Sequence, residues 1–131
     1  MSFRFRSASV PSQVIDVLIA QNGRPVQLLP LSATPDQQRW VFDGIRMRHI
    51  TQQNLCMQPE TAARGARVVV RTCDTGEYTL QRWVGLKLTN GRIQLASVIT
   101  DLYIDASAGA FGTLRMQPRS ATSLAQQFTM E

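Results

Sequence analysis

The chain is 131 residues long and 44% hydrophobic, which suits one compact domain spanning residues 1–131. No apolar run approaches the ~18 residues that a membrane span requires, and no signal peptide is visible at the start. Basic residues outnumber acidic ones by 14 to 9, but 13 of the 14 are scattered arginines. Because they form no block and are not interleaved with aromatic residues in a way that makes a base-stacking platform, the pattern argues against a nucleic-acid partner.

Short runs with an apolar residue at every second position recur along the chain, and this alternation is typical of half-buried β-strands. Turn-forming pairs such as Asn22-Gly23 and Asp43-Gly44 separate several of them. No segment carries the sustained apolar periodicity of a stable helix. The sequence therefore predicts an all-β fold of roughly twelve strands. In chain order, the runs lie at 3–5, 14–16, 26–28 and from 40; at 45–47, 56–58, 68–70 and from 83; and at 93–95, 103–105, 114–116 and from 128.

The chain also repeats itself three times, because a Gln-x-aromatic signature returns after 43 and then 45 residues. This period indicates a repeat architecture with copies at about 1–42, 43–86 and 87–131. In each copy, a polar residue stands seven positions before a glycine. A threefold arrangement would bring the three signature aromatics together in a shared core. The signatures are Gln38-Arg39-Trp40, Gln81-Arg82-Trp83 and Gln126-Gln127-Phe128, and the polar–glycine pairs are Asp16 and Gly23, Gln58 and Gly65, and Asp105 and Gly112.

Both cysteines belong to the middle copy, where Cys56 and Cys73 lie on either side of Gly65. Adjacent strands of one copy would bring them within reach of a disulfide, which is the favoured interpretation. Closing a loop of this size would stabilise the fold by ~3 kcal/mol. The alternative is a pair of buried thiols in a reducing cytosol.

The sequence offers no constellation for catalysis or for a metal. Its single histidine, His49, has no nucleophile or acid in a triad context and is expected in a loop. One histidine and two cysteines at no ligand spacing do not make a zinc site. No recurring pair of carboxylates suggests acid–base chemistry. We therefore expect neither enzymatic activity nor a cofactor.

Together, the three signatures, the constant seven-residue spacing and the cysteine pair resemble the ricin B-type lectins over essentially the whole chain. The resemblance implies a β-trefoil with pseudo-threefold symmetry, in which three hairpins form a short barrel and three hairpins cap it. It also implies a non-catalytic protein that binds galactose-type sugars, alone or as the binding subunit of a toxin. The aromatics Trp40, Trp83 and Phe128 are then structural.

In the family, a sugar pocket consists of an aspartate, an aromatic that stacks on the ring, a polar residue on the third run and an amide near the signature. The first copy matches this pattern best, although a leucine stands at the stacking position. Carboxylates make strong charge-assisted hydrogen bonds, and a flat apolar partner suits a sugar ring. The corresponding residues of the first copy are Asp16, Gln27, Leu29, Gln37 and Gln38.

The other two copies match less well. The third keeps Asp105, with Arg115 on the third run and Gln117 at the stacking position. The second has Gln58 and Val69 where the aspartate and the third-run polar residue are expected, so we expect it to be inactive. Two alternatives stand beside the sugar-binding reading. The aspartates could form turns, and the signature glutamines could satisfy buried backbone groups.

The sequence leaves two candidate functions, which belong to different classes of protein. The first is a carbohydrate-binding lectin with partly degenerate sites and glycan partners. The second is a trefoil without sugar binding that serves as a protein-interaction or toxin-assembly module. A homo-oligomer is left open. A disulfide would favour a secreted, extracellular protein, and the buried-thiol alternative a cytoplasmic one.

Overall fold

The computed structural model describes all of residues 1–131 as an all-β chain with two short 3-10 helices and no α-helix. Neither helix is long or apolar enough to cross a membrane. The elements are β1 (Ser2–Phe3), β2 (Phe5–Ser7), β3 (Gln13–Asp16), β4 (Gln27–Pro30), η1 (Pro35–Gln38), β5 (Trp40–Phe42), β6 (Met47–His49), β7 (Leu55–Pro59), β8 (Val68–Thr72), β9 (Trp83–Lys87), β10 (Ile93–Ser97), β11 (Tyr103–Asp105), β12 (Arg115–Gln117), η2 (Leu124–Gln126) and β13 (Phe128–Met130).

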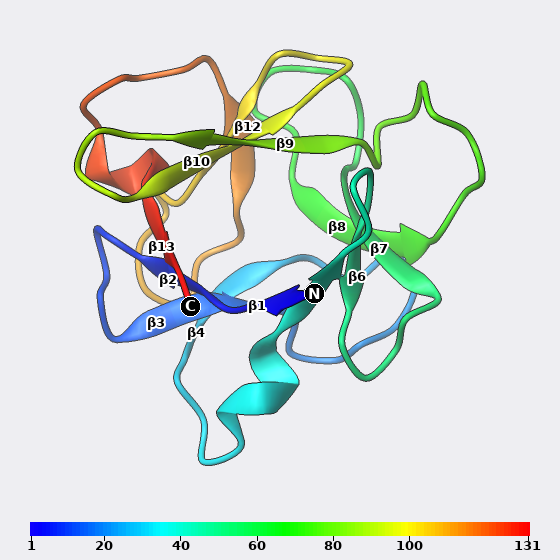
Figure 1. Ribbon diagram of the computed structural model, residues 1–131, viewed down its shortest axis with the longest axis horizontal. Helices are drawn as coiled ribbons and strands as arrows, with labels where there is room; N and C mark the ends of the chain where they lie inside the picture. Colours follow the sequence, from blue (N-terminus) through cyan, green and yellow to red (C-terminus); the bar gives the residue numbers. More distant parts are fainter.

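The first expected strand is divided in two, so the structure has 13 strands. β1 pairs with β5, but β2 pairs with β13. At the change of partner, Arg4 exchanges two backbone hydrogen bonds with Glu131, of 2.9 and 2.8 Å. The C-terminus therefore lies beside the segment between β1 and β2, which can be followed in Figure 1.

Each repeat contributes two strand positions to a barrel. Antiparallel pairs join β1 to β5, β5 to β6, β9 to β10, β10 to β13 and β13 to β2. The remaining junction, between β6 and β9, is bridged by a hydrogen bond of 2.9 Å from the backbone N–H of Trp83 to the carbonyl of Ile45. The three middle hairpins, β3–β4, β7–β8 and β11–β12, lie outside this barrel as caps.

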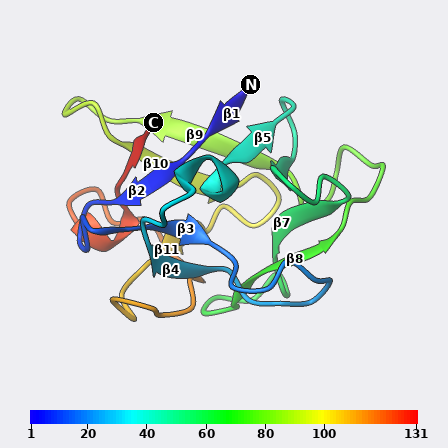
Figure 2. The ribbon, with the colours of Figure 1, turned by 90° about the horizontal axis from the view of Figure 1, so that it is seen from below.

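The caps meet around a threefold axis through a closed ring of backbone hydrogen bonds. Val26 donates to Val68, Val68 to Leu114, and Leu114 back to Val26, at 2.8, 2.8 and 2.9 Å. Figure 2 shows β3, β4, β7, β8 and β11 on one side of the molecule and β1, β9, β10 and both termini on the other. A six-position barrel closed by three equivalent caps is a β-trefoil, which confirms the predicted fold.

The signature aromatics occupy equivalent places in the core. Trp40, Trp83 and Phe128 are 1%, 2% and 0% exposed and belong to one apolar cluster. Each tryptophan also donates its indole N–H to a backbone carbonyl in the cap of its own repeat, Trp40 to Ile15 at 3.1 Å and Trp83 to Met57 at 2.8 Å. Such a partner is what a buried indole requires, and phenylalanine in the third repeat needs none.

The left-handed backbone position that Gly23 and Gly65 occupy falls one residue before the glycine in the third copy. Gly23 and Gly65 adopt left-handed backbone, with φ of 89° and 81°, but in the third repeat the equivalent residue is Phe111, with φ of 62°. Gly112 is required for a different reason, because a Cβ there would lie 2.5 Å from the Cβ of Ala108. The constant seven-residue spacing in the sequence therefore matches the backbone in only two of the three copies.

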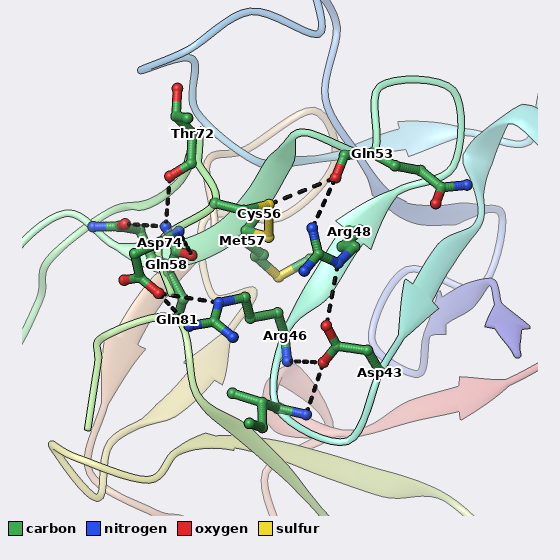
Figure 3. The surroundings of a disulfide bond; sticks show 12 residues. Asp43, Arg46, Arg48, Gln53, Cys56, Met57, Gln58, Thr72, Asp74 and Gln81 are labelled. Carbon is green, nitrogen blue, oxygen red and sulfur yellow. Dashed lines mark hydrogen bonds and ion pairs between the residues drawn. A yellow bond between two sulfur atoms is a disulfide. The ribbon is translucent and has the colours of Figure 1, made fainter. Parts of the chain in front are cut away.

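The disulfide prediction is confirmed, because Cys56 and Cys73 are bonded across the middle cap with their Cα atoms 5.0 Å apart. Cys56 lies in β7, and Cys73 follows the last residue of β8. Figure 3 shows the bond beside polar contacts of the second repeat, including the ion pair of Arg46 with Asp74. The cross-link therefore ties β7 to the residue that directly follows β8.

Candidate functional site

The signature glutamine ties each cap together through its side chain. Its amide nitrogen donates to the polar residue at the end of the second strand: Gln38 to Asp16 at 3.1 Å, Gln81 to Gln58 at 3.0 Å, and Gln126 to Asp105 at 3.1 Å. In each repeat the same nitrogen also donates to a backbone carbonyl and the amide oxygen accepts from a backbone N–H. These backbone partners are Pro30 and Ser32, Thr72 and Asp74, and Pro118 and Ser120.

Only in the first repeat does this arrangement border a pocket. A polar hollow of about 300 Å³ opens beside the carboxylate of Asp16. Gln37 and Gln38 line it from η1, and His49 lines it from the end of β6. Its remaining lining residues are Val17, Leu18, Ala20, Ser32, Thr34 and Thr51.

Asp16 is held in a fixed orientation at this pocket. One carboxylate oxygen accepts from the backbone N–H of Val17 at 2.7 Å, and the other accepts from Gln38. Burial raises the pKa of the Asp16 carboxyl above its usual range, while these hydrogen bonds and the proximity of His49 act in the opposite direction. Each oxygen can accept more than one hydrogen bond, so the group retains capacity for a ligand.

The structure corrects the expectation that His49 lies in a loop. It ends strand β6, is 5% exposed and packs edge-on against Trp40, with ring centres 5.5 Å apart. Its Nδ1 accepts from the backbone N–H groups of Thr51 and Gln52, both at 3.3 Å. Those contacts assign the proton of the neutral ring to Nε2. Burial lowers the pKa of His49, and the nearby charge of Asp16 opposes that effect.

His49 therefore brings a neutral ring to the pocket. Its Nε2–H has no hydrogen-bond partner within the chain. Ser97 Oγ is the only fully buried side-chain nitrogen or oxygen that lacks a partner, so the unpaired Nε2 of His49 must be accessible to solvent. Alternation from Met47 places His49 on the inward face of its strand, and that signal is present in the sequence. Ser32, Thr34 and Thr51 also line the pocket, but no sequence pattern indicates this, because they lie in irregular segments.

Two residues of the expected first-repeat site lie away from this pocket. Gln27 is the cross-strand partner of Asp16, but its amide donates to the carbonyl of Phe111 at 3.0 Å. It lines a separate small hollow of about 80 Å³. Leu29 pairs with Val14 and lines no pocket. The structure thus brings together Asp16, Gln37 and Gln38 from the expected set.

In the third repeat, the aspartate is occupied by its own chain. Asp105 is 8% exposed and accepts from the backbone N–H of Ser107 at 2.8 Å, from the Ser107 hydroxyl and from Gln126. Arg115 donates to the carbonyl of Gly65 at 3.0 Å, the counterpart of the Gln27 contact. Gln117 lies opposite Tyr103, and no pocket includes Asp105.

The second repeat has no charged acceptor at this position. Gln58 donates to the carbonyl of Pro59 at 3.1 Å and accepts from Gln81. Its cross-strand partner Val69 is fully buried, and Arg71 lies 3.7 Å from Glu60. At the position equivalent to Asp16, this cap therefore presents neither a carboxylate nor a hollow.

The threefold barrel and the repeated glutamine contacts define a β-trefoil with three related repeats. The model of the ricin-type beta-trefoil lectin domain matches residues 2–129, and the chain belongs to that family. No curated protein sequence matches this chain.

Among solved structures, the designed threefold-symmetric protein ThreeFoil is similar with a TM-score of 0.82 and 18% identity, covering 98% of this chain and 96% of that one. The agglutinin of Abrus precatorius has a TM-score of 0.80 and 18% identity over 99% of this chain, which spans 48% of the agglutinin chain. The C-terminal half of an earthworm R-type lectin, solved with GalNAc, gives 0.74 and 16%, covering 99% and 97%.

Proposed function

We propose that this protein is a non-catalytic lectin that binds carbohydrate in the pocket of its first repeat. The observation that carries the proposal is the carboxylate of Asp16, fixed by Gln38 and the N–H of Val17 at the edge of a polar hollow. An oriented carboxylate is a strong acceptor for neighbouring sugar hydroxyls. Membership of the lectin family and the GalNAc bound to the earthworm lectin support a galactose-type ligand.

Other groups in the pocket can complete the hydrogen bonding of a sugar. Gln37 is exposed and makes no side-chain hydrogen bond within the chain, so its amide is free to donate and to accept. The Nε2–H of His49 adds a neutral donor, and the hydroxyls of Ser32 and Thr51 add groups of either kind. We propose that these residues replace the contribution expected from Gln27.

No phenylalanine, tyrosine or tryptophan side chain lines this pocket. Leu18, 73% exposed, is its largest outward apolar surface and can cover only part of a sugar ring. Without a stacking partner, we expect the affinity for a monosaccharide to be in the millimolar range, which corresponds to about 4 kcal/mol of binding free energy. We propose that the second and third repeats are inactive, so the protein has one weak site.

The proposal is tested by titrating the isotopically labelled protein with galactose, GalNAc and lactose and following amide shifts. We expect shifts around residues 16–20, 37 and 49–51. Asp16→Ala should weaken binding by about tenfold or more, because a hydrogen bond to a charged group contributes roughly 1.5–3 kcal/mol. Asp105→Ala and Gln58→Ala are the matched controls at equivalent positions and should leave the affinity unchanged.

Acidification provides a second readout. Because burial raises the pKa of Asp16, binding should weaken at a higher pH than for an ordinary aspartate. If no sugar on a broad glycan array binds the wild-type protein, the lectin proposal fails and the interaction-module function replaces it. The disulfide supports a further proposal, that the protein works in an oxidising, extracellular environment.

A further inference from the structure

An apolar pocket of about 300 Å³ opens inside the barrel, away from the sugar pocket. Nine of its 11 lining residues are hydrophobic, and none comes from a cap hairpin. Buried side chains of Phe5, Met47, Trp83 and Leu95 contribute to its lining, and the half-exposed Met130 contributes as well. In Figure 2 the strands β1, β9 and β10 that contribute to it lie on the side of the two termini, opposite the caps.

The pocket exists because one repeat lacks a side chain that the other two have. Two positions after the signature aromatic, the first repeat has Phe42 and the third has Met130, but the second has Gly85. All three line the pocket. A Cβ built on Gly85 would meet nothing within 4 Å, and its φ is not in the left-handed region. The backbone therefore does not require glycine there, and the missing side chain leaves an open apolar space.

A single positive charge lies at the same pocket. Lys87 follows Gly85 by two residues, so strand alternation places it on the same face of β9, and it lines the pocket. It is the only lysine in the chain. Unlike most of the arginines, it takes part in no ion pair. The carboxylate of Glu131, at the neighbouring C-terminus, is already paired with Arg4 and Arg6.

We propose that the barrel pocket binds an aliphatic carboxylate, with its hydrocarbon chain in the space beside Gly85 and its carboxylate near the ammonium of Lys87. An apolar lining with one cation is complementary to an apolar molecule with one anionic group. Its volume lies at the lower end of ligand pockets, which suits a chain of about eight to ten carbons. This site shares no lining residue with the sugar pocket, so the two ligands would bind independently.

The test is a titration with decanoate, followed by amide and methionine-methyl shifts of the labelled full-length protein. We expect shifts at Met47, Gly85 and Met130 and none around Asp16. Gly85→Phe introduces the side chain that the first repeat carries and should abolish binding. Should that variant fail to fold, Gly85→Met, which copies the third repeat, gives the same test.

The charge is tested by Lys87→Met, which keeps an apolar stem. It should weaken decanoate binding about two- to fivefold, as expected for an exposed ion pair, and leave binding of the neutral alcohol decanol unchanged. Arg64→Met removes an equal charge from an exposed side chain outside the pocket and should have no effect. Shifts located elsewhere, unchanged binding to Gly85→Phe, or equal effects of the two charge variants would overturn the proposal. So would a pocket found closed by a second copy in a stable dimer.

Discussion

Gln38 donates its side-chain amide to Asp16 at 3.1 Å and so connects the repeat signature to the carboxylate of the candidate sugar pocket. The same amide nitrogen donates to the carbonyl of Pro30, and its oxygen accepts from the N–H of Ser32. Gln38 is only 4% exposed. One buried side chain therefore both fixes the cap and orients the carboxylate at the edge of the candidate pocket.

Replacing Gln38 with alanine should accordingly affect both stability and binding. It removes the side-chain partner of two partly buried backbone groups and of the Asp16 carboxylate, which should lower the free energy of unfolding by about 2–3 kcal/mol. Urea denaturation measures this change. Gln37→Ala is the control, because that neighbouring side chain is exposed and its loss should change stability by less than about 0.5 kcal/mol. Equal stabilities of the two variants would show that the Gln38 contacts contribute nothing.

The cross-link in the middle cap should contribute measurably to stability. Cys56 and Cys73 are 17 residues apart, and closing such a loop restricts the unfolded chain by ~3 kcal/mol. The double variant Cys56→Ala/Cys73→Ala should lose about that amount, and reducing agent should destabilise the wild-type protein but leave the variant unaffected. If reduction changes neither protein, the cross-link does not form in solution.

Glu131 should make stability depend on acidic pH. Hydrogen bonds and ion pairs with Arg6 and Arg4, at 2.5 and 2.6 Å, lower its pKa from 4.5 to about 2. Because the folded pKa lies below the unfolded one, this stabilisation is present above pH 4.5 and is lost as the pH falls toward 2. Glu131→Gln should therefore reduce the pH dependence of urea denaturation in that range. Glu77→Gln, at an exposed glutamate without an ion pair, is the control.

Much of the fold is contained in local patterns of the sequence. Two-residue alternation located the strands, and the Gln-x-aromatic period identified three copies whose aromatics occupy equivalent core positions. Strand pairing also aligns the repeats residue by residue: Asp16 faces Gln27, Gln58 faces Val69, and Asp105 faces Arg115. These features could be predicted because they depend either on residues close together in the chain or on a spacing that recurs in every repeat.

The site was less predictable because its contacts cross between repeats. The amide of Gln27 is turned toward Phe111, 84 residues away, and nothing near Gln27 in the sequence indicates that partner. His49 belongs to the second repeat but lines the pocket of the first. Alternation from Met47 indicates an inward His49, but a three-residue strand is a weak signal, and the tryptophan that His49 packs against cannot be identified from the neighbouring sequence.

His49 gives a last prediction, on its protonation and the stability that goes with it. Its Nδ1 accepts two backbone N–H groups, so the neutral ring should carry its proton on Nε2, and nitrogen-15 shifts should identify that tautomer at pH 7. Burial lowers the folded pKa below the ordinary value of 6.5, so the unfolded chain binds a proton more readily. Stability from this residue is therefore full above pH 6.5 and is lost as the pH falls toward the folded pKa.

The chain contains one histidine, so a loss of stability in that range can be assigned to it. Asp16 should act in the opposite sense, because its raised pKa favours the folded protein as the pH falls. We expect the urea midpoint of the wild-type protein to decrease from pH 7 to 5.5 and that of His49→Gln to stay nearly constant. A wild-type midpoint that is flat over this range, or a ring that titrates above pH 6.5, would contradict the neutral, buried state of His49.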